Sequence, residues 1–283
     1  MKVLILGATG MAGHVIALYF KGKGHDVVTY SVTPFPYCTN IVGNAFDIEN
    51  FKKVITNNEF DAVINCIGIL NQAADENPSK AVYLNSYLPH LIKDTLKDKK
   101  AKLIHMSTDC VFAGNTGPYF ENSLRDGRTF YDRTKALGEV EDDKNITFRN
   151  SIIGPDMNPD GIGLFNWFMK QKGPINGFTG ALWTGVTTLT LAKAMEKAIE
   201  QDLCGLYNLV NNTSISKYDL LVLFNKYFRN DKSKINKYGD FMLDKTLINT
   251  RNDFLFVVPN YEEMIKEMKE WVDEYPNLYP HYK

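Results

Sequence analysis

The sequence predicts an α/β fold in which a doubly wound parallel sheet is followed by a smaller C-terminal α/β lobe. Two observations predict the sheet: short apolar segments alternate with helical patterns as far as residue 154, and the first apolar segment runs directly into a cluster of glycines. A third observation predicts the lobe, because the regular alternation stops after Gly154-Pro155. We therefore expect residues 1–154 to form the sheet domain and residues 155–283 to form mainly a substrate lobe.

The composition is that of a globular enzyme-sized protein. The 283 residues carry a formal net charge of -1 without long runs of like charge, so neither nucleic acid nor a membrane surface is an expected partner. The apolar run that follows Met1 is too short for a signal peptide or a membrane span, and we expect a cytoplasmic protein. The four cysteines are dispersed, so no metal site is expected.

Residues 2–6 form the first predicted strand, and a helical pattern begins after the segment Gly7-Ala-Thr-Gly10-Met-Ala-Gly13. Glycines between a strand and a helix permit a tight turn and a close approach of pyrophosphate, whose charge the free helix amides stabilise. The spacing is G-x-x-G-x-x-G rather than the commoner G-x-G-x-x-G. We predict an NAD(P)-binding Rossmann domain whose cofactor contacts in this turn are Gly7, Thr9, Gly10, Met11, Ala12 and Gly13.

The end of the second predicted strand, residues 26–30, bears on the choice of cofactor. An acidic residue at this position would bind the ribose hydroxyl of NAD and repel the extra phosphate of NADP, but Tyr30 is followed by Ser31. The missing acid favours NADP, with Ser31 as a contact. No arginine is present either, which leaves the use of NAD open. Residues 33–45, with two prolines and a glycine, are predicted to form a loop.

Asp47 and Ile48 begin a short helical pattern. The Asp47 carboxylate could accept a hydrogen bond from an adenine amino group, or it could cap the helix, and the sequence does not decide between these roles. The apolar segment at residues 61–65 ends in Cys66-Ile67-Gly68, as expected for a central parallel strand that stops beneath a cofactor. A helix over residues 78–96 carries Asn85, which either braces neighbouring strand ends or is an exposed polar residue.

The candidate catalytic residues are Thr108, Tyr131 and Lys135. Thr108 follows a predicted strand over residues 103–106, whereas Tyr131 and Lys135 are four residues apart on a predicted helix and share one face. A nearby ammonium group favours phenolate, so we expect a lowered pKa for Tyr131. Thr108 could hold a carbonyl or alcohol oxygen against the phenol. The alternative is an aromatic residue packed on the core beside a solvated lysine.

The remaining elements complete the predicted sheet and lobe. Residues 113–129 are predicted to be a loop at the rim of the substrate site, and residues 146–150 another strand. The helix over residues 187–201 is expected to pack back on the sheet domain. The other lobe elements are a helical run at 164–169, a strand at 205–210, a helix at 215–228, an irregular stretch at 232–253 and a helix at 261–272.

Several motifs occur together in the first 155 residues. They are Gly7 to Gly13, Asp47-Ile48, Asn65-Cys-Ile-Gly68, Ser107-Thr-Asp-Cys-Val-Phe-Ala-Gly114, Tyr131 with Lys135, Gly138-Glu139, and Arg149-Asn-Ser151. In this order they resemble the extended short-chain dehydrogenase/reductases, and more narrowly the dTDP-4-dehydrorhamnose reductase family of NDP-sugar reductases. The C-terminal half resembles that family only generally.

The resemblance implies that adenine lies near Asp47 and Ile48 and that the nicotinamide lies near Cys66, Ile67 and Gly68. It implies hydride transfer to a keto carbon, C4, of a nucleotide-linked 6-deoxyhexose used for a surface polysaccharide. In this scheme Tyr131 donates the proton, Thr108 orients the oxygen, and Lys135 holds the cofactor ribose. The further residues that it implies at the cofactor or the sugar are Asn85, Asp109, Cys110 and Asn150. Cys110 stands where the family usually has tyrosine, and Ile152 where an aromatic is frequent, so the particular sugar stays open.

Three residues of the lobe could also contact the nucleotide. An indole suits a base and an arginine suits a diphosphate, which makes Trp167, Trp183 and Arg251 candidates, although core indoles and a surface arginine are the alternative. Two other functions remain: an epimerase or dehydratase with tightly bound NAD, and a non-catalytic regulatory subunit that binds NADP. A homodimer also stays open.

Overall fold

The protein is built around a seven-stranded sheet in the order β11-β6-β5-β4-β1-β2-β3. The structure is a computed structural model that describes residues 1–282. The strands are β1 (Lys2–Leu6), β2 (Asp26–Ser31), β3 (Thr39–Val42), β4 (Ala62–Asn65), β5 (Lys102–Met106), β6 (Ile146–Arg149) and β11 (Gly205–Asn208). Neighbouring strands are parallel throughout. The predicted doubly wound α/β fold is confirmed.

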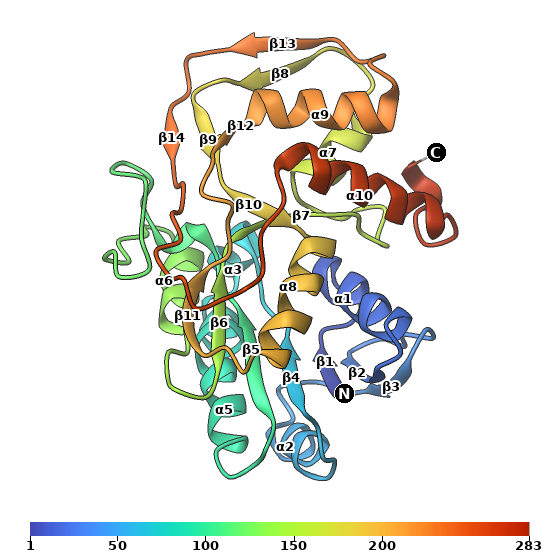
Figure 1. Ribbon diagram of the computed structural model, residues 1–283, viewed down its shortest axis with the longest axis vertical. Helices are drawn as coiled ribbons and strands as arrows, with labels where there is room; N and C mark the ends of the chain where they lie inside the picture. Colours follow the sequence, from blue (N-terminus) through green and yellow to red (C-terminus); the bar gives the residue numbers. More distant parts are fainter. Residues whose placement is uncertain (283) are drawn as a thin grey trace.

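Apolar side chains alternate between the two faces of the sheet, and helices cover both faces (Figure 1). In β1, Val3 and Ile5 join the core cluster that contains α1 (Met11–Gly22) and α8 (Thr188–Glu200). The intervening Leu4 and Leu6 join a second cluster on the opposite face. This opposite face is covered by α2 (Ile48–Thr56), η1 (Val82–Tyr87) and α5 (Leu88–Thr95). Burial on both faces explains why the strands read as continuous apolar runs.

The helix predicted over residues 78–96 contains a π-helical segment. It consists of α4 (Pro78–Ala81), η1 and α5, and it follows α3 (Asn71–Glu76). Helix α6 (Phe130–Leu137) packs against η1 and is preceded by the 3-10 helix η2 (Asp109–Val111). Single π-helical turns are rare and occur frequently at functional sites, and this one carries Asn85.

A second unit lies beyond the carboxyl ends of the central strands (Figure 1). Its helices are α7 (Leu164–Lys170), α9 (Lys217–Arg229), α10 (Tyr261–Glu274) and the 3-10 helix η3 (Pro280–Tyr282). Its strands are β7 (Ser151–Ile153), β8 (Ile175–Phe178), β9 (Ala181–Trp183), β10 (Gly185–Thr187), β12 (Ile215–Ser216), β13 (Ile235–Tyr238) and β14 (Leu243–Asp244). They form small sheets in the orders β10-β7, β12-β9-β14 and β13-β8.

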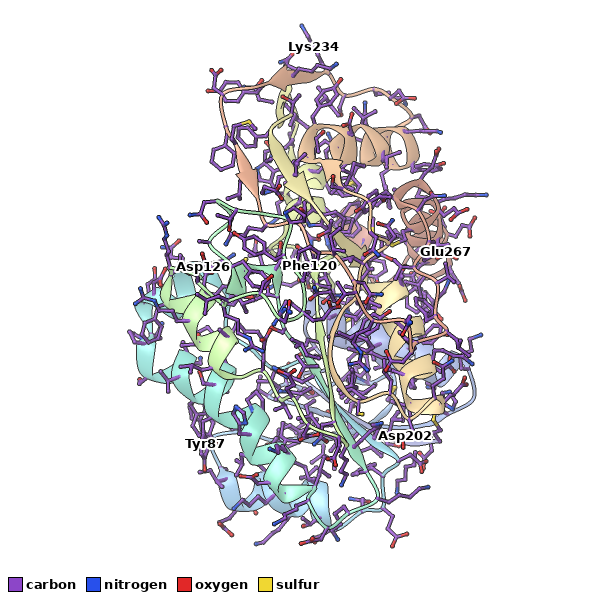
Figure 2. The ribbon with its side chains drawn as sticks, turned by 60° about the vertical axis from the view of Figure 1, so that its left-hand side comes forward. Tyr87, Phe120, Asp126, Asp202, Lys234 and Glu267 are labelled. Atoms are coloured by element: carbon purple, nitrogen blue, oxygen red, sulfur yellow. The ribbon has the colours of Figure 1, made fainter. Side chains whose placement is uncertain are left out.

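The chain returns to the first unit after residue 154. Strand β11 pairs with β6 at one edge of the main sheet, and α8 packs against α1. In the other direction, the loop 113–129 reaches the second unit, where Gly114 O accepts a hydrogen bond from the Asp244 backbone (3.1 Å). Figure 2 shows Phe120 and Asp126 of this loop at the level where the two units meet.

Two predicted irregular segments contain short strands. Residues 33–45 include β3, which pairs only with β2 at the edge of the sheet, and residues 232–253 include β13 and β14. The prediction of irregular structure was wrong in both places. Edge strands are partly exposed and therefore need no apolar run, so the pattern that identifies a buried strand is missing.

Within residues 1–282, none of the helices combines the length and apolar character needed to cross a membrane. Over the same range, no group of three or more His, Cys, Asp or Glu side chains is arranged to hold a metal ion.

Candidate active site

The turn between β1 and α1 depends on two glycines. Gly7 has a φ of +82°, a backbone region that side chains other than hydrogen rarely adopt. A Cβ atom on Gly13 would lie 2.1 Å from the Gly7 carbonyl oxygen, so no larger residue fits there without moving the backbone. Helix α1 therefore starts unusually close to the end of β1.

The first turn of α1 fits an anionic phosphate. Its N-cap residue, Gly10, is exposed, provides no side-chain cap, and is followed by no acidic residue in the first turn. The first intrahelical bond runs from His14 N to Gly10 O (3.2 Å), so the N–H groups of Met11, Ala12 and Gly13 have no acceptor within the helix. Free amides, the helix dipole and the missing Cβ together suit a dinucleotide pyrophosphate.

The end of β4 lies against this turn. The Cys66 backbone N–H donates to Leu6 O (3.0 Å), and a Cβ on Gly7 would come within 3.2 Å of the Cys66 backbone. Ile67 N donates to the side chain of Asn65 (3.1 Å). The predicted cofactor residues Cys66, Ile67 and Gly68 thus follow β4 directly beside the glycine turn.

Asn85 is a buried brace and not an exposed polar residue. Its side-chain oxygen accepts from Ile69 N (2.9 Å), while its amide nitrogen donates to Ile69 O (2.9 Å) and to Thr134 Oγ1 (3.2 Å). These bonds connect the loop after β4 to helix α6. Asn85 therefore acts on the candidate cofactor site by fixing the backbone beside Gly68.

Ser31 and Asp47 lie after β2 and before α2. The Ser31 hydroxyl donates to Thr33 O (2.7 Å) and accepts from the Asn40 amide (3.0 Å). Asp47 is the N-cap of α2, because its carboxylate accepts from Asn50 N (3.3 Å). The helix-cap alternative is therefore present in the structure, and Ile48 is the first residue of that helix.

The three candidate catalytic side chains are brought together at the carboxyl end of β5. Tyr131 and Lys135 lie on α6, and Thr108 lies close enough to the Tyr131 phenol to influence its pKa. The Lys135 Nζ donates to Met106 O at the end of β5 (2.6 Å). Thr108 Oγ1 also accepts from Cys110 N (3.1 Å), which fixes the hydroxyl at the start of η2. All three side chains are buried.

The expected lowering of the Tyr131 pKa is wrong in direction. Burial raises the pKa of the Tyr131 phenol, and Cys110 and Asp109 add to this effect, while Thr108 opposes it in part. Burial also lowers the pKa of Lys135 to about 8. Removing both groups from water disfavours their charged forms, and burial is the largest influence on the pKa of each. Tyr131 is consequently a protonated phenol at neutral pH.

A buried ion pair that the sequence analysis did not assign fixes α6 to the sheet. Arg149, which is fully buried, donates to Glu139 through Nε (2.9 Å) and Nη2 (2.8 Å), and Ser107 Oγ donates to the same carboxylate (2.5 Å). Burial alone would raise the pKa of Glu139, but the hydrogen bonds and charge of Arg149, with Ser107 and Arg125, lower it. The signal in the sequence was an arginine and a glutamate next to apolar segments, which are seldom buried without a partner.

Three predicted sugar contacts lie close to the catalytic residues. Two of them follow Thr108 in the chain, and the third follows β6, the strand next to β5. Asp109 and Cys110 follow Thr108, and burial raises the pKa of both side chains, that of Cys110 to about 12. Asn150 follows β6 and is 2% exposed, and neither polar atom of its side chain has a hydrogen-bond partner among residues 1–282. An unpaired buried amide at this edge suits a polar ligand.

The side chains of Trp183 and Arg251 are both engaged in contacts within the protein. Trp183 is 6% exposed and packs against Tyr261, with ring centroids 5.6 Å apart, so the core alternative describes it. Arg251 donates to Cys204 O (2.7 Å) and Leu206 O (2.9 Å) near the amino end of β11, at the other end of that strand from the candidate site. Its guanidinium is committed to the backbone and to Asp253, which corrects its assignment as a substrate ligand. Trp167 is exposed on α7.

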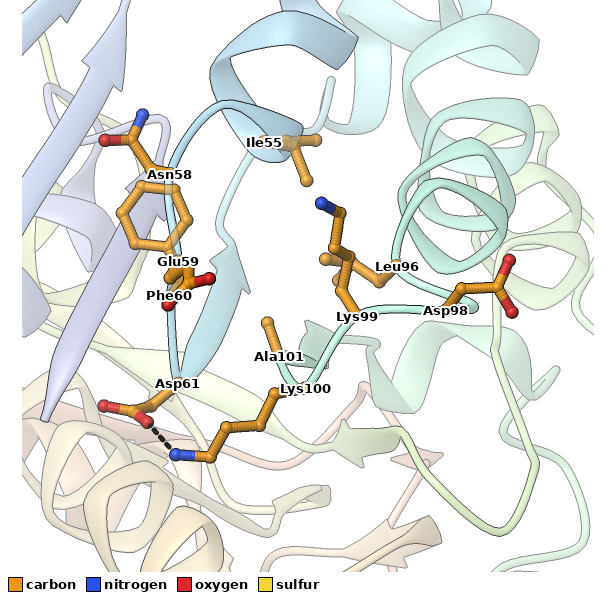
Figure 3. Close-up of a pocket in the computed structure, with 10 residues that line it drawn as sticks. All are labelled: Ile55, Asn58, Glu59, Phe60, Asp61, Leu96, Asp98, Lys99, Lys100 and Ala101. Atoms are coloured by element: carbon orange, nitrogen blue, oxygen red, sulfur yellow. Dashed lines mark hydrogen bonds and ion pairs between the residues drawn. The ribbon is translucent and has the colours of Figure 1, made fainter.

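A hollow of about 430 Å³ lies at the amino ends of β4 and β5, opposite the candidate site. Figure 3 shows its lining, which includes an ion pair between Asp61 and Lys100 (2.7 Å). Ligands of open parallel sheets bind outside the carboxyl ends of the strands, so the candidate active site is the opposite edge.

The parallel sheet, the glycine turn and the Thr108, Tyr131 and Lys135 arrangement define an extended short-chain dehydrogenase/reductase. More narrowly, residues 1–239 match the family described as RmlD substrate binding domain, and the chain belongs to that family.

Two curated relatives and one solved structure illustrate the similarity. The chain is 29% identical over 143 residues to "Probable low-salt glycan biosynthesis reductase Agl14" of Haloferax volcanii, covering 49% of this chain and 48% of that protein. It is 26% identical over 235 residues to dTDP-4-dehydrorhamnose reductase of Escherichia coli, covering 79% and 77%. The chain thus spans about half the length of the first relative. A dTDP-4-dehydrorhamnose reductase structure from Bacillus anthracis, in complex with NADP, has a TM-score of 0.78 at 20% identity, covering 94% of this chain and 98% of that one.

Proposed function

We propose that the protein is an NADPH-dependent reductase of a nucleotide-linked 6-deoxyhexose that carries a keto group at C4. One observation supports this proposal above all. Thr108, Tyr131 and Lys135 come together at the carboxyl end of β5, at the same edge of the sheet as the glycine turn. The relatives named as a probable glycan biosynthesis reductase and as a dTDP-4-dehydrorhamnose reductase support the substrate class. We further propose a role in deoxysugar biosynthesis for a surface polysaccharide.

The residues of the turn would hold the cofactor. The amides of Met11, Ala12 and Gly13 would bind its pyrophosphate, with Gly7, Thr9 and Gly10 shaping the turn around it. Asp47 and Ile48 would lie near the adenine, and Cys66, Ile67 and Gly68 beside the nicotinamide. Ser31 in place of an acid at the end of β2 supports NADP over NAD, and the NADP in the Bacillus anthracis structure agrees with that choice.

When bound, reduced nicotinamide supplies a hydride to the keto carbon. Tyr131 donates its phenolic proton to the keto oxygen, for which a protonated phenol is the required state. Thr108 hydrogen-bonds the same oxygen and orients it. Lys135 positions the cofactor ribose from its place on α6, and Asp109, Cys110 and Asn150 contact the sugar.

Reduction and the two alternatives require different things of Tyr131. An epimerase or dehydratase of this type must first remove a proton from a substrate hydroxyl, which requires phenolate, whereas a reductase starts from the phenol. A non-catalytic subunit needs no such group at all.

The test is NADPH oxidation across a panel of NDP-4-keto-6-deoxy sugars, with products identified by NMR. We expect one sugar alcohol to form for each NADPH consumed. An epimerised product without net consumption of NADPH would identify the epimerase alternative. NADPH that binds but is never oxidised would identify the regulatory one.

We also propose that two copies of the chain associate through η1 and α6. These packed elements expose Val82 and Tyr87 on η1 and Leu137 at the end of α6, and Figure 2 shows Tyr87 on the outer surface. Exposed apolar side chains grouped in this way are typical of interfaces. Light scattering should give twice the mass of the chain, and Leu137→Glu should give the mass of one chain. A monomeric wild-type protein would contradict this proposal.

A further inference from the structure

The C-terminal segment is connected to the glycine turn by three side chains from distant parts of the sequence. Trp271 lies on α10, Tyr279 follows that helix, and His14 lies on α1 (Figure 1). Trp271 Nε1 lies 3.0 Å from the Tyr279 hydroxyl, which lies 2.8 Å from His14 Nε2. His14 Nδ1 in turn lies 2.9 Å from the Gly10 carbonyl oxygen. Tyr279 is 1% exposed and His14 is fully buried.

The direction of each hydrogen bond in this chain follows from the Gly10 carbonyl. A carbonyl oxygen can only accept, so His14 Nδ1 carries a proton and donates it. Burial lowers the pKa of His14 to about 4, so the ring is neutral at pH 7 and Nε2 is an acceptor. The Tyr279 hydroxyl therefore donates to Nε2, and its oxygen accepts from the Trp271 indole. Every polar atom of the three side chains has a partner of the right kind.

The carbonyl at the end of this chain belongs to a peptide that the cofactor would touch. Gly10 O and Met11 N–H lie in one planar peptide group and point in opposite directions. Holding Gly10 O toward His14 therefore holds Met11 N–H away from it, on the exposed side of the turn. Gly10 has no Cβ to limit its backbone angles, so hydrogen bonds to its carbonyl hold the peptide: one from the His14 backbone N–H (3.2 Å) and a second from His14 Nδ1, whose direction the Tyr279 hydroxyl fixes.

We propose that Tyr279 is a positioning residue for the cofactor: through His14 it fixes the Gly10-Met11 peptide, so that the Met11 amide faces a dinucleotide phosphate. This inference rests on the proposed function, because it takes the glycine turn as the phosphate site. It concerns the affinity for the cofactor and not the chemical step. The C-terminal segment of the second unit is thereby part of the cofactor site of the first.

Tyr279→Phe removes only the hydroxyl in the middle of the chain. Tyr275→Phe is the matched control, because Tyr275 belongs to the same segment and packs on Trp271 in a tilted arrangement, with ring centroids 4.5 Å apart, but takes no part in the chain of hydrogen bonds. The dissociation constant of NADPH would be measured by calorimetry with the full-length protein, together with the melting temperature of the free protein. Steady-state kinetics would give KM for NADPH and kcat separately.

We expect Tyr279→Phe to weaken NADPH binding about tenfold, the effect of one buried hydrogen bond, with kcat at saturating NADPH retained. Tyr275→Phe should bind as the wild type does. Should Tyr279→Phe not fold, Trp271→Phe removes the terminal donor and should weaken binding about threefold.

Equal NADPH affinity in Tyr279→Phe and the wild type would overturn the inference while leaving the proposed function intact. Equal losses in Tyr279→Phe and Tyr275→Phe would also overturn it, because they would indicate general loosening of the segment. A wild-type protein that does not bind NADPH would instead remove the proposed function, and the inference with it.

Discussion

The Nζ atom of Lys135 lies 2.6 Å from the backbone oxygen of Met106, the last residue of β5. This hydrogen bond fixes helix α6 to the sheet two residues before Thr108 and holds the phenol of Tyr131 beside the Thr108 hydroxyl. The lysine is buried to reach this position, and burial lowers its pKa to about 8. The arrangement that supports catalysis therefore has a cost in stability.

Because burying the lysine lowers the stability of the folded protein, we expect Lys135→Met to change the free energy of unfolding by an amount that depends on pH. The lysine pKa is about 10.4 in an unfolded chain and lower in the folded protein, so between these values the unfolded state binds more protons and wild-type stability rises with pH. Below pH 8 the full cost of burying the ammonium is present. We expect Lys135→Met to be more stable than the wild type by about 2 kcal/mol at pH 7, allowing for the lost hydrogen bond, with a smaller difference at pH 10.

Urea unfolding at both pH values measures this difference. A variant that is less stable than the wild type by the same amount at pH 7 and pH 10 would contradict the account of Lys135.

Tyr131→Phe should reduce kcat about a hundredfold to ten-thousandfold, since it removes the proton donor. NADPH affinity should stay near the wild-type value, because only a hydroxyl is lost. Tyr238→Phe serves as a control, since Tyr238 is 40% exposed on β13. Turnover by Tyr131→Phe at the wild-type rate would show that another group supplies the proton.

Gly13→Ala should abolish detectable NADPH binding, because its new methyl group would lie 2.1 Å from the Gly7 carbonyl oxygen. The matched control is Gly22→Ala, at the other end of the same helix, where a Cβ meets nothing within 4 Å. Fluorescence titration with NADPH compares the two variants. Equal affinities would mean that the turn is not the cofactor site.

Glu139→Gln should lower the free energy of unfolding by about 3 kcal/mol or more, because it leaves the charge of Arg149 buried without a counter-ion. Glu141→Gln tests the same change at an exposed carboxylate, where an effect below about 0.5 kcal/mol is expected. Denaturant unfolding of both variants gives the comparison. Similar values for the two would contradict the importance of the buried pair.

The sequence was sufficient for the sheet, and it predicts the edge of the sheet at which the candidate site lies. Strands buried on both faces read as apolar runs, and the glycines after Leu6 mark the turn into α1. Parallel strands place their carboxyl ends at one edge, so residues that follow β1, β4 and β5 meet there without any contact having to be predicted.

Properties that depend on distant contacts could not be read from the sequence. The spacing of Tyr131 and Lys135 suggested mutual charge effects, but the desolvation that reverses the pKa shift depends on the packed surroundings. Arg251 suited a diphosphate by its chemistry, yet the carbonyl groups of Cys204 and Leu206 occupy it. His14 and Tyr279 are separated by 265 positions, and no periodic pattern records their contact.

We propose that the protein transfers hydride from NADPH to a keto carbon, with Tyr131 as proton donor. NADPH carrying deuterium at the transferred position, supplied with an NDP-4-keto-6-deoxyhexose, tests it most directly. We expect NMR to find the deuterium on C4 of the product, one per NADPH consumed, and to find almost none with Tyr131→Phe in the same time. Bound NADPH that retains its deuterium with every sugar, or equal transfer by Tyr131→Phe, would contradict it.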